Sequence, residues 1–201
     1  MPEPRLTIFD YGAGNLHSLA KAVAALGTAP RLETDPQRAL DADLLLLPGV
    51  GAFTPAAECL APAREAVRQA LAGGLPCLGI CLGMQLLFEA SDEGPGDGLA
   101  VLAGRVTRLD ADRLPQIGWN ALEDARDPLF ARTGLETAYY ANSFVCRPDD
   151  PAAVIAWSTH GRDRFPAAVR RGRTLGVQFH PEKSSRAGVA FLHAALQELL
   201  A

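Results

Sequence analysis

The sequence has no long hydrophobic run and few cysteines. No apolar stretch approaches the ~18 residues that a membrane-spanning helix needs, and the first residues lack the charged-then-apolar layout of a signal peptide. We therefore expect no membrane association. The 4 cysteines are too few for a disulfide scaffold, and their spacing matches no zinc site. A reducing cytoplasm is the simplest compartment for such a chain, and we expect neither a metal nor a cofactor.

Neither sign of charge is in strong excess. The formal net charge is −4, and a content of 48% hydrophobic and 21% charged residues is ordinary for a globular protein. A solvated strand edge or turn explains the one tight basic cluster, Arg170, Arg171 and Arg173, more simply than a nucleic-acid site does. We expect no nucleic-acid partner. Repeats and low-complexity linkers are also absent, so residues 1–201 are predicted to form a single domain.

Strand and helix patterns alternate in the first half of the chain. Strands are predicted at residues 6–9, 31–33, 44–47 and 76–80, and helices at 16–26, 56–71 and 82–90. The run at 44–47 is continuously apolar, which is typical of a strand buried on both faces. Such alternation predicts a three-layer α/β fold, in which helices cover both faces of a mostly parallel, twisted sheet.

The second half of the chain has a different character. It begins after a polar, glycine- and proline-containing loop at residues 91–98. Short strand-like segments follow at 104–109, 137–141, 154–157, 167–170 and 175–179, and a helix is predicted at 187–200. Because these strands are not separated by helical patterns, we expect them to be antiparallel additions to the sheet.

The segment Gly79-Ile80-Cys81-Leu82-Gly83 is the most informative part of the chain. A nucleophile elbow requires glycines two before and two after the nucleophile, because the chain turns sharply from strand to helix and larger side chains would collide with nearby backbone. A thiol at this apex lies near a helix N-terminus, which favours the thiolate. A buried structural cysteine is the alternative. The glycine bracket favours catalysis by Cys81, and the other cysteines, which lack it, are interpreted as core residues.

A cysteine nucleophile needs a base, and the base needs a group that orients it. Among the 4 histidines, His180 follows the apolar strand at 175–179. It is therefore expected at the C-terminal edge of the sheet, where active-site crevices of open α/β folds lie. Glu182 follows after Pro181, which stiffens the turn, so its carboxylate is placed to bind one imidazole nitrogen and fix the tautomer. Alone, this motif is also compatible with the first turn of a helix.

Two glycine-containing segments are candidates for ligand contacts. The N–H of Leu82 is the usual first donor of an oxyanion hole in an elbow. Pro48-Gly49-Val50-Gly51 follows the buried strand at 44–47 and would reach the same crevice, although a plain turn is an equal alternative. Residues 11–17 faintly resemble a dinucleotide fingerprint, but His17 stands where the third glycine must allow close packing, so we disfavour that interpretation.

Taken together, these segments resemble the class I (triad) glutamine amidotransferases, and within them the glutaminase subunits of imidazole glycerol phosphate synthase. Two segments look like general signatures of the family: Gly-Ile-Cys-Leu-Gly-Met-Gln at 79–85 and Gln-Phe-His-Pro-Glu at 178–182. Those that look specific to the subfamily are residues 10–15 with Ser18, 47–53, 118–120, and Lys183-Ser184. The resemblance covers nearly the whole chain and implies a flavodoxin-like fold.

The resemblance also implies a reaction and the residues that perform it. Cys81 would attack the carboxamide of glutamine and release ammonia, His180 would move the proton, and Glu182 would orient His180. Hydrolysis of the thioester would then yield glutamate. The implied oxyanion hole is Gly49, Val50, Gly51 and Leu82; glutamine would be held by Gly51, Gln85 and Ser143; and the implied partner interface contains Asn15, Trp119, Tyr139 and Lys183.

The implied partner is a separate cyclase subunit with a (β/α)8-barrel fold, in a heterodimer that makes imidazole glycerol phosphate and an aminoimidazole carboxamide ribotide for histidine biosynthesis. Ammonia would pass from this chain to that subunit. The resemblance further implies that the isolated chain is nearly inactive. One physical reason would be a Gly49–Val50 peptide whose carbonyl points inward, because a missing oxyanion donor costs ~10²–10³ in rate.

Two short segments differ from the family pattern. Gln116 stands where the family often has histidine before the Gly-Trp-Asn run, and Asn142 and Phe144 flank Ser143 where the family often has histidine and tyrosine. Both differences concern hydrogen bonds near the glutamine side chain and the interface. The alternative functions are a glutaminase for the pyridoxal phosphate or anthranilate pathway, a non-catalytic stress or binding protein with a similar elbow, and a cysteine peptidase.

Overall fold

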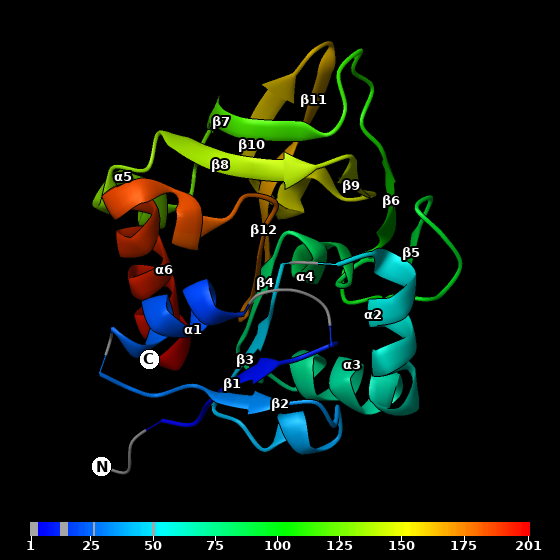
Figure 1. Cartoon of the computed structure of the whole chain (residues 1–201), viewed down its shortest axis with the longest axis vertical. Coiled ribbons are helices and arrows are strands. Elements are labelled where there is room, and N and C mark those ends of the chain that lie inside the picture. The colour runs from blue at the N-terminus through cyan, green and yellow to red at the C-terminus, as the bar shows by residue number, and fades with distance from the viewer. Residues whose placement is uncertain (1–3, 13–15, 26, 50) are drawn as a thin grey trace.

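A seven-stranded sheet forms the centre of this computed structural model, which describes residues 4–12, 16–25, 27–49 and 51–201 (Figure 1). In spatial order its strands are β10 (Val154–His160), β11 (Asp163–Arg171), β12 (Thr174–Val177), β4 (Cys77–Ile80), β3 (Leu44–Leu47), β1 (Leu6–Phe9) and β2 (Arg31–Glu33). Neighbours from β12 to β2 are parallel, whereas β10 and β11 are antiparallel additions. The parallel part has the flavodoxin-like strand order, which confirms the predicted fold class.

Helices cover both faces of the sheet, as predicted. On one side lie α1 (His17–Ala24), α5 (Pro128–Thr133) and α6 (Ser185–Leu200), and on the other lie α2 (Phe53–Leu60) and α3 (Arg64–Ala72) (Figure 1). In β3, Leu44 and Leu46 join the hydrophobic cluster on the α6 side, while Leu45 and Leu47 join the cluster on the α2 side. The continuous apolar run is therefore a strand buried on both faces. No helix among the described residues is long and apolar enough to cross a bilayer.

Two predicted helices are shorter or more broken than expected. The helix predicted at 56–71 is divided into α2 and α3 by the 3-10 turn η2 (Ala61–Ala63), where Pro62 lacks the N–H that a continuous helix would use. The helix predicted at 82–90 ends early, as α4 (Leu82–Gln85). After Gln85, the carbonyls of residues 86–88 accept hydrogen bonds from the main chain of residues 99–102. This distant pairing replaces the helical bonds that the local pattern predicted.

Part of the second half folds outside the main sheet, which corrects the prediction that all its strands extend that sheet. One small sheet contains β5 (Ala90–Ser91), β6 (Gly104–Arg108) and β9 (Phe144–Pro148), and another contains β7 (Gln116–Ala121) and β8 (Thr137–Asn142). Strands β7 and β9 and helix α5 were not predicted. In β7 the more buried positions hold Gln116, Gly118 and Asn120, and none of these is a large apolar residue. The alternation of apolar inner and polar outer residues that signals a half-buried strand is therefore missing. Helix α5 has only 6 residues, although Asp127 caps it and Gly134 ends it in the left-handed conformation.

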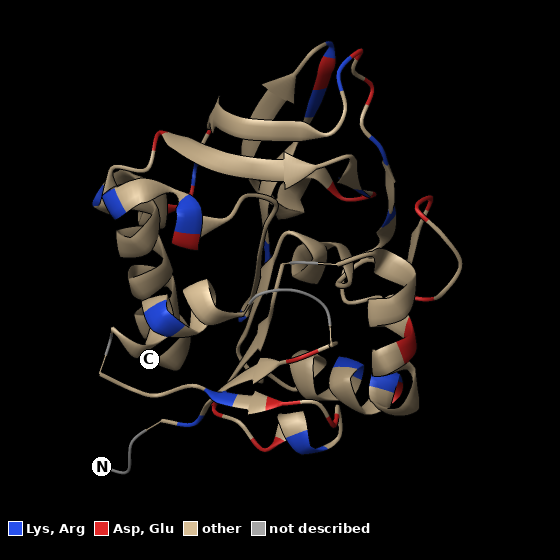
Figure 2. Ribbon diagram, viewed as in Figure 1, with Lys and Arg blue, Asp and Glu red and all other residues tan. Residues whose placement is uncertain are grey.

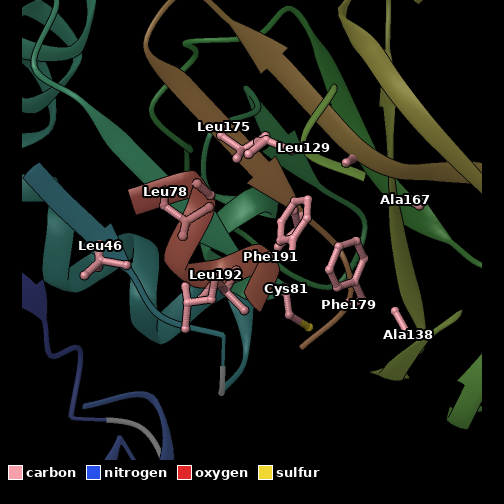
Figure 3. Packing of buried hydrophobic residues seen from close by; sticks show 14 of the residues in the cluster. Leu46, Leu78, Cys81, Leu129, Ala138, Ala167, Leu175, Phe179, Phe191 and Leu192 are labelled. Carbon is pink, nitrogen blue, oxygen red and sulfur yellow. The ribbon is translucent and has the colours of Figure 1, made fainter. Parts of the chain in front are cut away.

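Aromatic rings fill the core where β12 leaves the sheet. Phe179 packs against Phe191 of α6 with ring centroids 5.6 Å apart and against Tyr140 of β8 at 6.1 Å. Phe191 also contacts Phe130 of α5 at 5.0 Å. Figure 3 shows Phe179 and Phe191 beside Leu192 and close to Cys81. The rings therefore connect the end of β12 to helices α5 and α6, and their packing fixes where the residue after Phe179 is placed.

Removing the central ring of this cluster is expected to destabilise the fold. Phe191 is completely buried, so Phe191→Ala should lower the free energy of unfolding by ~3–5 kcal/mol through lost burial and a residual cavity. The exposed Leu32 provides a control, and Leu32→Ala should change it by less than ~0.5 kcal/mol. Urea titration followed by circular dichroism measures both values; equal effects of the two variants would contradict this description of the core.

Candidate active site

Cys81 occupies a strained turn between β4 and α4. Its backbone has φ +49° and ψ −104°, a conformation that residues other than glycine rarely adopt. A Cβ atom added to Gly79 would lie 2.6 Å from the carbonyl oxygen of Gly83, and one added to Gly83 would lie 2.0 Å from that of Leu47. Neither site has room for a side chain. The structure thus confirms the strand–turn–helix geometry and the steric reason for both glycines.

His180 lies just beyond β12, at the start of the 3-10 turn η4 (Pro181–Lys183). Its Nδ1 is 2.9 Å from Oε1 of Glu182. Because a carboxylate accepts this hydrogen bond, Nδ1 carries the hydrogen and Nε2 is left to interact with Cys81. Burial opposes the charge of the imidazole, but its interactions with the Cys81 sulfur and the Glu182 carboxylate outweigh that effect and raise the pKa of His180 to about 10. The arrangement therefore favours an imidazolium beside the sulfur.

The main chain of His180 is held by β8. Its N–H donates to the carbonyl oxygen of Tyr139 at 2.8 Å. The hydroxyl of Ser184 donates to the carbonyl oxygen of His180 at 2.6 Å and accepts from the N–H of Tyr139 at 2.8 Å. Ser184 is completely buried. This role of Ser184 was not predicted, and the only signal for it in the sequence is its place directly after Lys183 in the subfamily segment.

A cavity of about 310 Å³ opens beside the elbow. It is lined by Gly49, Gly51, Cys81, Leu82, Gln85, Glu93, Pro115, Ala141, Asn142, Ser143, Phe144, His180 and Lys183. The structure thus brings together the predicted nucleophile, base, glutamine contacts and most of the predicted oxyanion segment. Val50 lies outside the described residues, as does the orientation of the Gly49–Val50 peptide.

The loop after β3 approaches the elbow closely. A Cβ atom on Gly49 would lie 2.7 Å from the carbonyl oxygen of Ile80 and 3.1 Å from Cβ of Cys81. Gly51 has φ +121°, which only glycine adopts without strain. Glycine at these positions lets backbone, rather than side chains, line the cavity on this side. That placement suits a loop that donates N–H groups to a developing oxyanion.

Amide side chains form the floor of the site. Nε2 of Gln85 donates to the carbonyl oxygen of Phe144 at 3.0 Å and to Oε1 of Gln178 at 3.3 Å. Nε2 of Gln178 in turn donates to Sγ of Cys81 at 3.4 Å. Gln178 is completely buried. Its contact with the nucleophile was not predicted, because nothing in the local sequence around Gln178 indicates that its side chain reaches Cys81.

The two departures from the family pattern lie opposite each other. Gln116 and Asn142 are partners in the β7–β8 register, and both are buried. Nδ2 of Asn142 donates to the carbonyl oxygen of Phe144 at 3.1 Å, so this carbonyl accepts from both Asn142 and Gln85.

Glu93 was not predicted as a residue of the site. Its carboxylate accepts from the N–H of Phe53 at 3.0 Å, and the residue lines the cavity.

The β7–β8 hairpin presents an uncharged, partly apolar surface. Ile117 and Trp119 are 68% and 55% exposed, and the ring of Trp119 meets that of Tyr139 edge to face at 6.4 Å. Neither strand contains a charged residue, as Figure 2 shows by the tan ribbon of this hairpin. Large exposed apolar side chains on neighbouring positions are typical of interaction surfaces. Lys183 is exposed nearby in η4, whereas Asn15 lies outside the described residues.

Comparisons with known proteins agree with this geometry. The sequence model of the family described as "Glutamine amidotransferase class-I" matches residues 7–196. The chain is 50% identical to "Imidazole glycerol phosphate synthase subunit HisH" of Symbiobacterium thermophilum, over 94% of this chain and 91% of the relative. It is 43% identical to the protein of the same name from Synechococcus elongatus, with the same coverage.

Solved structures are similar in fold. One described as "Crystal structure of glutamine amidotransferase" superposes with a TM-score of 0.75 at 22% identity, over 97% of this chain and 98% of that one. Another, "Structure of PurLQS from Thermotoga maritima", has a TM-score of 0.74 at 20% identity and covers 98% of this chain and 100% of that one. At these identities the likeness concerns the fold alone.

The charge state of His180 is expected to depend on Cys81. In Cys81→Ala the sulfur no longer stabilises the imidazolium, so the pKa of His180 should fall from about 10. Because that pKa exceeds the ordinary 6.5, the contribution of His180 to stability is complete below about pH 6.5 and is lost as the pH rises through about 10. Nuclear magnetic resonance of the imidazole nitrogens measures the change.

The resonances of His193 serve as the control, because this residue lies in α6 and hydrogen-bonds to Ala22. They should agree between the two proteins at every pH. Identical His180 titrations in the wild type and Cys81→Ala would contradict the interaction between the two side chains.

Proposed function

This chain belongs to the class I glutamine amidotransferases, and from that premise we propose that it is the glutaminase subunit of an imidazole glycerol phosphate synthase. The subunit hydrolyses glutamine to glutamate and ammonia, and the ammonia serves the cyclase subunit in histidine biosynthesis. One observation supports this function above the others: in a chain 50% identical to a HisH subunit, Cys81 and His180 line a single cavity, and Glu182 hydrogen-bonds to His180.

The first half of the reaction forms a thioester. The Cys81 thiolate attacks the carboxamide carbon of glutamine, and the negative charge moves to the amide oxygen. Backbone N–H groups of Leu82 and of the 49–51 loop stabilise that oxyanion. The imidazolium of His180 gives its proton to the leaving nitrogen, so the C–N bond breaks and ammonia departs.

The second half regenerates the enzyme. Neutral His180 accepts a proton from water, which attacks the thioester carbon. The C–S bond then breaks, glutamate leaves and Cys81 is again a thiolate beside an imidazolium. Throughout both halves Glu182 keeps Nδ1 protonated, so the proton is exchanged at Nε2. The raised pKa of His180 favours the charged form with which the cycle begins.

The cavity suits a small polar substrate, since about 310 Å³ is at the lower end of the range for ligand sites. Gly51, Gln85 and Ser143 are proposed to hold glutamine. The carboxylate of Glu93 lines the same cavity, and we assign it to the α-ammonium group because it supplies the complementary charge. Such contacts keep the carboxamide next to Cys81.

The proposed partner is the cyclase subunit, a (β/α)8 barrel, in a heterodimer. The exposed Trp119, whose ring meets that of the half-buried Tyr139, and the exposed Lys183, which lines the cavity, support this proposal. Asn15 is part of the same proposal but lies outside the described residues.

We also propose that residues 1–201 form one domain, supported by the family match over 7–196. A cytoplasmic location is proposed because the 4 cysteines are free.

Glutamine hydrolysis tests the function directly. The purified chain should be nearly inactive alone, and ammonia release should rise when the barrel subunit and its nucleotide ligand are added. Cys81→Ala should abolish that activity. Cys59→Ala should retain it, because Cys59 is exposed and not in the core as the sequence predicted. Enzymatic measurement of glutamate follows the reaction. Retained activity in Cys81→Ala, or stimulation only by the synthase of another pathway, would contradict the proposal.

Binding to the barrel subunit tests the interface. Trp119→Ala should weaken the complex by ~30-fold or more, since a large aromatic side chain at the centre of an interface is worth at least ~2 kcal/mol. Leu32→Ala alters an equally exposed side chain in β2, an edge strand of the main sheet, and should leave the affinity unchanged. Isothermal titration calorimetry compares the two. Equal affinities for wild type and Trp119→Ala would place the interface elsewhere.

A further inference from the structure

Gln178 contacts the nucleophile in addition to His180. The side chain is completely buried one residue beyond β12, and its Nε2 donates to Sγ of Cys81 at 3.4 Å. The proposed mechanism above leaves this contact without a function. A buried amide that donates to a reacting sulfur is placed where it can change the reactivity of that sulfur.

Neighbouring hydrogen bonds determine which end of the Gln178 amide faces the sulfur. A backbone carbonyl only accepts, so Gln85 must present Nε2 to the oxygen of Phe144. The same nitrogen lies 3.3 Å from Gln178 and must meet an acceptor there, which is Oε1 of Gln178. The nitrogen of Gln178 is then left facing Cys81. The orientation of the Gln178 amide is thus fixed by a chain of hydrogen bonds that begins at the Phe144 carbonyl, which can only accept.

We propose that Gln178 is a further catalytic residue, whose amide N–H stabilises the Cys81 thiolate and whose orientation is fixed by Gln85. This deepens the proposed function and rests on it where glutamine is concerned. Hydrogen bonds to an ionised partner are roughly twice as strong as neutral ones. In a buried site they also replace the water that a thiolate would otherwise need.

The amide keeps its donor at every stage of the cycle, whereas His180 changes its charge. His180 gives up its proton when ammonia leaves and regains one only when water attacks the thioester. An amide does not titrate, so Gln178 acts beside the imidazolium when the C–S bond breaks and negative charge returns to Sγ. Thiolate formation at the start and thiolate departure at the end both benefit from the same N–H group.

Gln85 joins this contact to the substrate site. It lines the cavity and is a proposed glutamine contact, while its Nε2 is shared between Phe144 and Gln178. Asn142 supports the same Phe144 carbonyl from β8. Glutamine held at Gln85 is therefore two hydrogen bonds away from the sulfur that attacks it.

Alkylation of Cys81 tests the proposal without glutamine. Iodoacetamide reacts with thiolate, so the pH of half-maximal labelling, read by mass spectrometry of the Cys81 peptide, reports how readily the thiolate forms. Gln178→Met removes the donor and should raise this pH by about 1 unit or more. Gln178→Glu keeps the shape but adds negative charge, so its shift should be larger. Labelling of the exposed Cys59 should be unchanged in each protein and serves as an internal control.

Two further variants separate this function from a purely structural one. Thr7→Val removes another completely buried polar group, which lies in β1, and should leave the labelling pH unchanged. Gln85→Met should shift it in the same direction as Gln178→Met. The double variant should shift no further than Gln178→Met alone, because Gln85 acts only through Gln178. An unchanged labelling pH in folded Gln178→Met and Gln178→Glu, or fully additive shifts, would overturn the proposal.

Turnover with the barrel subunit distinguishes the two proposals. Gln178→Met should lower kcat for glutamine hydrolysis by about tenfold or more with little change in KM, because the donor acts on the nucleophile and not on bound glutamine. If the wild type does not hydrolyse glutamine but the labelling shifts occur, the proposed function fails and the contact between Gln178 and Cys81 stands. If the wild type is active and Gln178→Met has a normal labelling pH and a normal kcat, the assignment of Gln178 fails.

Discussion

The chemistry of this protein depends on how closely two stretches of backbone approach each other beside Cys81. Any side chain on Gly83 would collide with the carbonyl of Leu47, and any side chain on Gly79 would collide with that of Gly83. Glycine alone lets α4 lie against β3 and β4 at that distance. The turn that results holds Cys81 in a positive-φ conformation beside the cavity. Every other functional contact is arranged around the sulfur that this turn presents.

The residues that follow β12 supply two of the groups beside that sulfur. Gln178 and His180, two positions apart, both interact with Cys81, while Phe179 between them packs into the aromatic cluster with Phe191. His180 exchanges a proton during the reaction, whereas Gln178 only donates a hydrogen bond. The packed ring sets the position of both, so core packing and catalysis are joined within three consecutive residues.

Strand β8 belongs both to the site and to the proposed interface. Tyr139 directs its ring toward the exposed Trp119, while its main chain pairs with His180 and with the hydroxyl of Ser184. At the end of the strand, Asn142 supports the Phe144 carbonyl that orients Gln85. The uncharged hairpin is thus connected to both the proton-transfer side and the amide side of the cavity by hydrogen bonds of a single strand.

Features that depend on short stretches of backbone could be predicted from the amino-acid order: the doubly buried strand at 44–47, the glycines around Cys81, and the spacing of His180 and Glu182. These could be predicted because steric fit and side-chain reach act within a few residues. Long-range folding set three other features: the helix after Cys81 ends at Gln85, β7 and β8 form a separate hairpin, and Gln178 donates to Cys81. Each of these features depends on hydrogen bonds or packing between segments far apart in the chain. A local sequence pattern gives no information about the free energy of such contacts.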